Sequence, residues 1–273
     1  MILVNGKADN RISISDRAIQ YGDGLFETIA YRNGQLEFVD THLMRLAVGC
    51  KRLAIPFRQL KQLKEELSIV LTELAEHDAV IKIIISRGSG GRGYLADPSV
   101  EPTRIISTYP LPTYPANYQE IGVTARICQQ RLSENTSLAG IKHLNRLEQV
   151  LARTEWHDPE ISEGIMLDQH ENVIEGTMSN LFIVKAGELF TAELNKSGVA
   201  GIIRAEILDI TADNNIPCTE TIISKSTLAD ADEVFVCNSI IGIWPVTCIY
   251  NGKINYNYPV GKITRQLQNL LSN

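Results

Sequence analysis

The sequence lacks several features that would assign it to a class at once. Its five cysteines are odd in number and none forms a C-x-x-C pair, which argues against a disulfide framework or a zinc knuckle. No apolar run approaches membrane-spanning length, and the apolar part of the N-terminus is too short for a signal peptide. Positive charge is not in excess, since the net charge is −6 and the isoelectric point is near 5.5. We expect a soluble, cytoplasmic protein with reduced thiols that binds neither nucleic acid nor a membrane.

What is present is an ordinary globular composition, with 273 residues, 44% hydrophobic and 21% charged. That length suits one large domain or two modest ones. The segment "PLPTYPANYQEIG" has three prolines and no apolar period, which is typical of a linker. We predict an N-terminal lobe at 1–110, a linker at 111–121 and a C-terminal lobe at 122–273.

Hydrophobic periodicity predicts strands and isolated helices in both lobes. In the first lobe, Asn33-Gly34 indicates a hairpin, and Asp40 is expected to cap a helix that stops at Pro56. A second helix is expected at about 60–76, followed by strands at 80–86 and 103–110. In the second lobe, an amphipathic helix, a β-rich set and two further helices are expected. The inward face of the amphipathic helix is predicted to hold Leu144, Leu147, Val150 and Leu151. The fold class is therefore α/β (mixed α+β) in two lobes, not a regular doubly wound sheet.

A glycine-rich loop follows the strand at 80–86, and Gly88, Gly90 and Gly93 satisfy G-x-G-x-x-G. A dinucleotide-binding turn needs a helix to begin at these glycines, but the loop continues with prolines and no helical stripe follows. Arg87 and Arg92 flank the glycines, and paired guanidiniums suit a carboxylate. The loop is thus either an ordinary hairpin loop or a carboxylate-binding loop.

Lys142 stands among apolar residues just before the predicted amphipathic helix. By itself it is best explained as an exposed lysine at a helix start. Apolar surroundings and a helix N-terminus also lower the pKa of a lysine and make a neutral amine nucleophile.

Seven segments occur in an order that resembles a known family: "RAIQYGDGLFET", "THLMRL", "ISRGSGGRGY", "LAGIKHLNRLEQVLAR", "VIEGTMSNLFIV", "SGVAGIIR" and "NSIIGIWPV". Together they resemble the fold-type IV (branched-chain aminotransferase-like) enzymes that depend on pyridoxal 5'-phosphate (PLP). This family includes branched-chain and D-amino acid aminotransferases and 4-amino-4-deoxychorismate lyases, and two of the segments look most like the lyases. The resemblance implies a smaller N-terminal α/β lobe and a larger β-rich C-terminal lobe, with PLP between them.

The resemblance also implies roles for individual residues in binding the cofactor. Lys142 would be the catalytic lysine that binds PLP covalently, and Glu175 would pair with the pyridine nitrogen and keep it protonated. The phosphate would be bound by Arg45 and by the helix N-terminus that follows "SGVAG". Further phosphate contacts would come from Ile202, Ile203, Asn238 and Ser239. Without the resemblance, Glu175-Gly176 is a plain turn and Arg45 a solvated charge.

On the substrate side, Arg92 would bind a substrate carboxylate, and Phe26, Tyr94 and Tyr109 would line the site, although aromatics at such places are more often core. Arg17 and Asn180 are interpreted as structural supports. The implied activity is conversion of the dicarboxylate 4-amino-4-deoxychorismate to 4-aminobenzoate and pyruvate, for folate biosynthesis, by a homodimer with no metal. A D-amino acid or branched-chain aminotransferase on the same scaffold, and a non-catalytic binding protein, are the alternatives.

Overall fold

The computed structural model describes residues 1–252 and 254–272 and divides into two compact units. The first unit comprises Met1–Thr113 and Ile141–Asn145, and the second comprises Tyr114–Gly140 and Arg146–Asn273. The change of unit at Thr113 falls in the proline-bearing segment. The return of residues 141–145 to the first unit has no signal in the sequence.

The first unit is built on a six-stranded antiparallel sheet with strand order β2-β1-β6-β5-β3-β4. The predicted hairpin is confirmed, because Asn33 and Gly34 both adopt the left-handed conformation that this turn requires. Its second strand is much shorter than the first. The strands are β1 (Ile2–Val4), β2 (Lys7–Ala8), β3 (Gly24–Arg32), β4 (Gln35–Leu36), β5 (Ala79–Ser86) and β6 (Thr103–Pro110).

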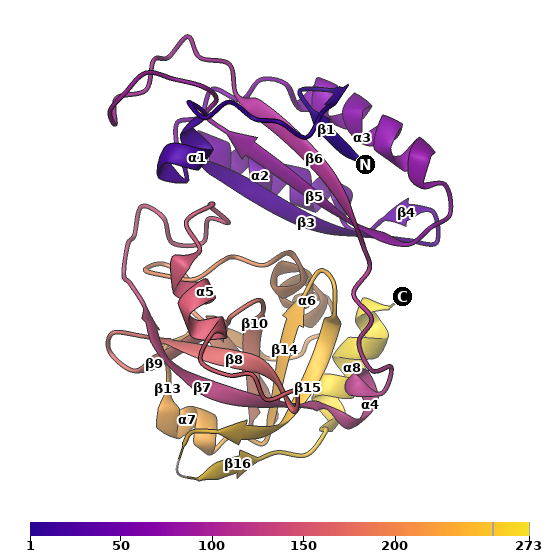
Figure 1. Ribbon diagram of the computed structural model, residues 1–273. Helices are drawn as coiled ribbons and strands as arrows, with labels where there is room; N and C mark the ends of the chain where they lie inside the picture. The colour runs from indigo at the N-terminus through magenta and orange to yellow at the C-terminus, as the bar shows by residue number, and fades with distance from the viewer. Residues whose placement is uncertain (253, 273) are drawn as a thin grey trace. The chain divides into compact units, whose positions relative to one another are not determined.

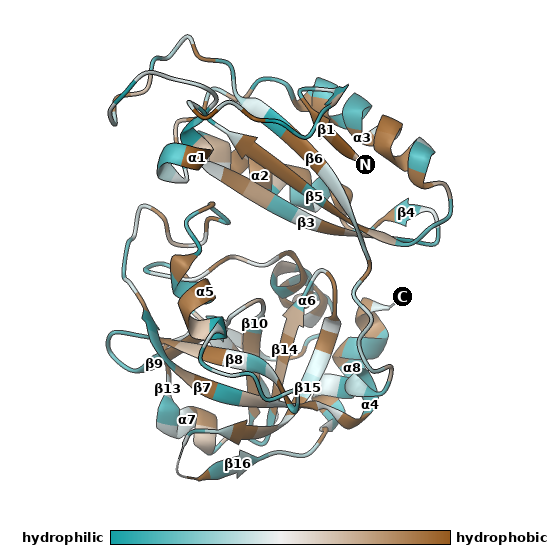
Figure 2. Cartoon of the chain, viewed as in Figure 1, coloured by the Kyte–Doolittle hydropathy of each residue, from teal (hydrophilic) through white to brown (hydrophobic). Residues whose placement is uncertain are grey.

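Three helices accompany this sheet: α1 (Arg17–Tyr21), α2 (Val39–Arg52) and α3 (Leu60–Leu74). The apolar faces of α2 and α3 pack on one face of the sheet, where Leu46, Leu63 and Ile83 are fully buried. Figure 2 shows β5 coloured hydrophobic along most of its length. The prediction that Asp40 caps α2 is wrong. The helix begins earlier, after a left-handed turn at Phe38, so that Asp40 lies in its first turn.

The second unit contains a ten-stranded mixed sheet with strand order β12-β11-β10-β14-β15-β7-β8-β9-β13, and β16 pairs with β15. An additional pairing of β9 with β10 closes part of this order into a ring around an apolar core. The strands are β7 (Val123–Leu132), β8 (Ile161–Asp168), β9 (Asn172–Gly176), β10 (Asn180–Lys185), β11 (Glu188–Ala192), β12 (Cys218–Thr221), β13 (Ile223–Ser224), β14 (Glu233–Asn238), β15 (Gly242–Tyr250) and β16 (Asn255–Asn257).

Five helices belong to this unit: α4 (Tyr118–Ile121), α5 (Leu147–Arg153), α6 (Ile202–Asp213), α7 (Lys225–Ala229) and α8 (Lys262–Leu271). Helices α6 and α8 pack together beside β14 (Figure 1). Strands and helices alternate irregularly in both units, which confirms the predicted mixed α/β class. None of the helices described is long and apolar enough to cross a membrane.

The predicted inward face of α5 is wrong. Leu147, Val150 and Leu151 have 75%, 54% and 54% of their surface exposed, whereas Ala152 is buried. Leu144 lies outside the helix altogether. Periodicity identifies an apolar face but cannot tell whether the chain's own core covers it.

Candidate functional site

Lys142 lies in an extended segment that pairs with the first residues of β3. The Phe26 N–H donates to the Lys142 carbonyl at 3.0 Å, and the Leu144 N–H donates to the Gly24 carbonyl at 3.0 Å. Leu25 and His143 form the bridge between these two bonds. The lysine is therefore held by strand pairing and not by a helix N-terminus, because α5 begins only at Leu147.

The side chain of Lys142 lies over an aromatic ring of the same unit. Its Nζ is 4.5 Å from the centre of the Phe26 ring, and the Nζ of Lys82 is 5.2 Å from the same ring. Phe26 is only partly buried. The structure thus brings two predicted site residues, Lys142 and Phe26, into contact. Tyr109 lies on β6 with half of its surface exposed.

Arg45 is not a solvated charge, because it pairs with a carboxylate buried between β3 and α2. Its Nε donates to Glu27 Oε1 at 2.8 Å, and the Glu27 side chain is 1% exposed. His42, one turn earlier on α2, lies 2.6 Å from Glu27 Oε2 through Nδ1. Burial lowers the pKa of His42, and its charged neighbours Arg45 and Lys142 lower it further, against the opposing effect of Glu27. We therefore assign a neutral His42 that donates to Glu27.

Arg92 and Tyr94 stand in the glycine-rich loop between β5 and β6, and no helix follows the glycines. Both side chains are exposed, that of Tyr94 by 88%. Between the described strands β5 and β6 no helix begins at the glycines, so this stretch offers no helix N-terminus on which a pyrophosphate could rest.

Glu175 lies at the end of β9 in the second unit and is 4% exposed. Its Oε2 accepts the backbone N–H of Val199 at 2.8 Å, and its Oε1 lies 3.5 Å from Gln149 Nε2. Arg146 is close enough to Glu175 to interact electrostatically, although burial dominates and lowers the pKa of that guanidinium. A carboxylate oriented in this way is a suitable partner for a cationic nitrogen.

The loop before α6 is hydrogen-bonded to the end of β9, through Glu175, and to the start of β10, through Asn180. The Asn180 Nδ2 donates to the Val199 carbonyl at 2.8 Å, and Gly201 forms the N-cap of α6 without a side-chain cap. A Cβ at Gly201 would lie 2.0 Å from Asn180 Oδ1, so a larger residue would have to displace the Asn180 side chain that holds this loop. The first helical residues, Ile202 and Ile203, are buried. A helix start with no side-chain cap is suited to bind an anion through its N–H groups.

Strand register places these groups at one edge of the sheet. Asn180 pairs with Glu175 on one side and with Cys237 on the other, so that the turn after β14 lies beside them. Asn238 uses its side chain to hold this turn: its Oδ1 accepts the N–H groups of Ile240 and Ile241, and its Nδ2 donates to the Met178 carbonyl. Ser239 is half-buried in the same turn.

Sequence reasoning missed Glu163, which organises the turn between β9 and β10. It is 1% exposed, and its Oε1 accepts from the Gly164 N–H, the Thr177 N–H and the Thr177 hydroxyl, at 2.6–3.0 Å. Its Oε2 accepts from the Ser179 hydroxyl at 2.6 Å. A charged residue inside the apolar strand "ISEGIMLD" was the available signal.

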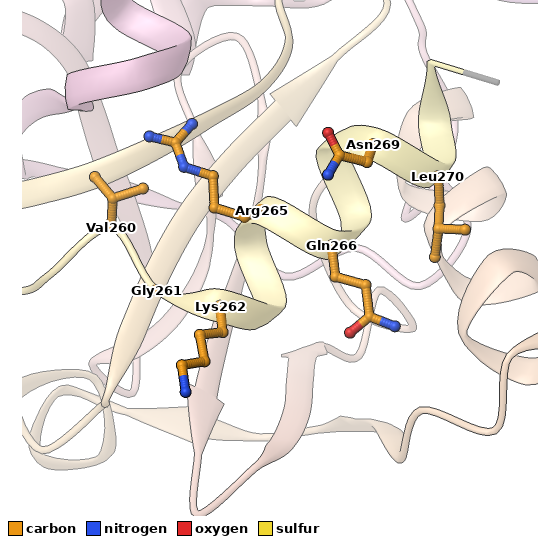
Figure 3. A pocket seen from close by; sticks show the side chains of 7 residues that line it. All are labelled: Val260, Gly261, Lys262, Arg265, Gln266, Asn269 and Leu270. Atoms are coloured by element: carbon orange, nitrogen blue, oxygen red, sulfur yellow. The ribbon is translucent and has the colours of Figure 1, made fainter.

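A separate hollow of about 480 Å³ lies along α8 and is shown in Figure 3. It is lined by Val260, Gly261, Lys262, Arg265, Gln266, Asn269 and Leu270. Arg265 donates to the backbone carbonyls of Gln119 and Glu120, and the lining residues that the structure describes include no carboxylate or imidazole that could act as a base. None of the predicted site residues lines it.

Comparison with known proteins gives a consistent picture. The family described as amino-transferase class IV matches residues 24–249. The chain is 39% identical over 272 residues to the aminodeoxychorismate lyase of Vibrio harveyi, covering 100% of both chains. It is 31% identical over 275 residues to a putative branched-chain-amino-acid aminotransferase of Methanocaldococcus jannaschii, covering 98% of this chain and 93% of that protein. The crystal structure of 4-amino-4-deoxychorismate lyase from Pseudomonas aeruginosa matches with a TM-score of 0.94 and 45% identity, covering 99% of this chain and 98% of that chain.

Proposed function

This chain belongs to the class IV aminotransferase family, and we propose that it is a PLP-dependent lyase that converts 4-amino-4-deoxychorismate to 4-aminobenzoate and pyruvate. The observation that carries the proposal is full-length similarity, at 39% and 45% identity, to two proteins described as lyases of this substrate. Folate biosynthesis is the pathway in which this product is used.

The residues of each unit fit the cofactor. Glu175, fixed by the Val199 N–H, would bind the pyridine nitrogen, and the uncapped start of α6 at Ile202 and Ile203 would bind the phosphate. Ser239 would add a hydroxyl to the phosphate, whereas Asn238 would act mainly by holding the turn that carries Ser239.

Two basic residues of the first unit are further proposed cofactor ligands. Lys142 would form the covalent attachment through Nζ. Arg45 would contribute to phosphate binding while Glu27 holds its guanidinium.

In the reaction, the substrate amine would take the place of Lys142 Nζ at the covalent attachment, and the released Lys142 amine would remove the proton from the substrate carbon that carries the nitrogen. Bound PLP supplies an electron sink for the charge left on that carbon, and Glu175 supports it by keeping the ring nitrogen protonated. The C–O bond to the enolpyruvyl group then breaks and the substrate ring becomes aromatic. Lys142, now an ammonium, would return a proton to the departing enolpyruvate, which becomes pyruvate. Arg92 would bind a substrate carboxylate, with Phe26, Tyr94 and Tyr109 beside the substrate.

The decisive experiment is a pyruvate-release assay. The purified holoenzyme is mixed with 4-amino-4-deoxychorismate and no keto acid, and pyruvate and 4-aminobenzoate are expected in equal amounts. Failure to release pyruvate, together with turnover of an amino acid with 2-oxoglutarate, would instead establish the aminotransferase activity of the related proteins.

We further propose that the enzyme is a cytoplasmic homodimer. The exposed apolar face of α5, formed by Leu147, Val150 and Leu151, supports association with a second copy, and Figure 2 shows hydrophobic colour on this helix. The five cysteines are free, as expected in a reducing compartment.

A further inference from the structure

Arg17 is a charged residue at the start of α1 that is almost completely buried. Only 4% of its surface is exposed. Its Nε donates to Asp23 Oδ2 at 2.8 Å, and its guanidinium carbon lies 4.8 Å from the centre of the Tyr21 ring. Burying an arginine costs free energy unless the N–H groups of its guanidinium all find hydrogen-bond acceptors.

The remaining arms of Arg17 hold the glycine-rich loop. Nη1 donates to the Gly93 carbonyl at 2.9 Å, and Nη2 donates to the Tyr94 carbonyl at 3.0 Å. The Gly93 N–H donates to the Tyr21 hydroxyl at 3.1 Å, and the Tyr21 and Tyr94 rings lie 5.6 Å apart. Gly93 and Tyr94, which follow Arg92, are therefore held in place by hydrogen bonds to their backbone and by contact between the rings of Tyr21 and Tyr94.

The chain before Arg92 is fastened to the same segment. The Arg17 N–H donates to the Gly88 carbonyl at 3.0 Å, and the Gly90 N–H donates to the Ser15 carbonyl at 3.2 Å. A Cβ at Gly90 would lie 3.4 Å from Arg17 Cδ, so the loop runs close against this side chain. Gly91 and Arg92 are the two residues between the fastened points.

Arg17 is itself fixed in place. Asp23 also accepts from Arg87 Nε at 2.7 Å, and Arg87 donates to the carbonyls of Leu53 and Ala54. Burial raises the pKa of the Asp23 carboxyl, but hydrogen bonds from Arg87 and Arg17 outweigh it and lower the pKa below its usual value. The Asp23 carboxylate therefore stays charged and, together with Arg87, fixes the position of the Arg17 side chain to which the loop is hydrogen-bonded.

We propose that Arg17 is a positioning residue for substrate binding, which aims the exposed Arg92 by fixing the loop backbone on both sides of it. This inference rests on the proposed function, in which Arg92 binds a substrate carboxylate. Arg17 touches neither substrate nor cofactor in this role. Its effect falls on substrate affinity and depends on the presence of Arg92.

The test is a double-mutant cycle on kcat and KM for pyruvate release, with the variants Arg17→Gln, Arg92→Gln and both together. Arg17→Gln is expected to raise KM roughly tenfold or more, since hydrogen bonds from a charged group are lost, and to change kcat little. In the Arg92→Gln background, Arg17→Gln is expected to have no further effect on KM. Arg11→Gln is the matched control, because Arg11 pairs with Asp9 at the surface and is 85% exposed.

Three results would separate the possible failures. The positioning role is refuted if Arg17→Gln leaves KM unchanged. It is also refuted if the double variant raises KM by the product of the two single-variant effects, because the two residues then act independently. If Arg17→Gln does not fold, Tyr21→Phe replaces it in the cycle, because it removes only the acceptor of the Gly93 N–H. A wild-type enzyme that releases no pyruvate refutes the proposed function itself, before any variant is compared.

Discussion

Replacement of Glu163 tests how the turn beside Glu175 is held together. In Glu163→Ala the backbone N–H of Gly164 loses its acceptor, whereas the Thr177 N–H keeps the Gly164 carbonyl at 2.8 Å and the two hydroxyls can rotate to other partners. A buried donor left without a partner costs about 1–3 kcal/mol, so the free energy of unfolding should fall by about that amount. Urea unfolding of the holoenzyme, followed by circular dichroism, measures this loss.

Glu163→Gln is the matched control for this prediction. Burial raises the pKa of the Glu163 carboxyl, and the four hydrogen bonds to it lower the pKa by less. A glutamine amide keeps an oxygen that can accept from the Gly164 N–H and the Thr177 hydroxyl, and its NH2 group can donate to the Ser179 hydroxyl once that hydroxyl rotates. The glutamine variant should therefore lose less than about 1 kcal/mol. Equal losses in the two variants would refute the assignment of this stability to the hydrogen bonds of the Glu163 side chain.

Three further predictions follow from the site. Lys142→Ala should abolish pyruvate release and leave no cofactor on the protein after borohydride reduction; cofactor that stays attached would mean that another lysine binds it. His42→Asn should flatten the pH dependence of stability below pH 6.5. Because the pKa of His42 is lowered in the folded protein, the unfolded chain takes up a proton first as the pH falls, and the wild type loses at most about 1.4 kcal/mol of stability per pH unit. Parallel stability curves of the two proteins from pH 7.5 to 5.5 would contradict this. Leu147→Glu should convert the proposed dimer to a monomer in sedimentation. Ile254→Glu, the control at a residue that is 59% exposed on another segment, should leave the dimer intact. If both variants remain dimeric, α5 does not lie in the interface.

Local signals in the sequence predicted much of the fold. The hairpin at Asn33-Gly34, the strand at 103–110 and the helix after Gly201 follow from turn chemistry and periodicity, which act over a few residues. The start of α2 was misplaced because a left-handed turn at Phe38 is not a usual helix start.

The candidate site was predictable only in part. Motif resemblance drew attention to Lys142, Glu175 and Arg92, but the groups that hold the turn after Glu175 and the loop around Arg92 come from distant parts of the chain. Glu163 accepts from residues 14 and 16 positions away, and Arg17 holds carbonyls 76 and 77 positions away. Such pairings depend on sheet register and loop closure, which no local pattern encodes.

The passage of residues 141–145 through the first unit has a consequence for synthesis of the chain on the ribosome. At Gly24–Phe26, strand β3 pairs with β5 along one side and acquires the partner on its other side only when Lys142 and Leu144 have been synthesised, although β6 already ends at Pro110. At the usual 5–20 residues per second, the 35 residues from Pro110 to Asn145 take about 2–7 s to translate. During that interval a hydrophobic strand edge of the nascent chain remains open to other chains and to chaperones, and it closes only when the lysine segment is in place.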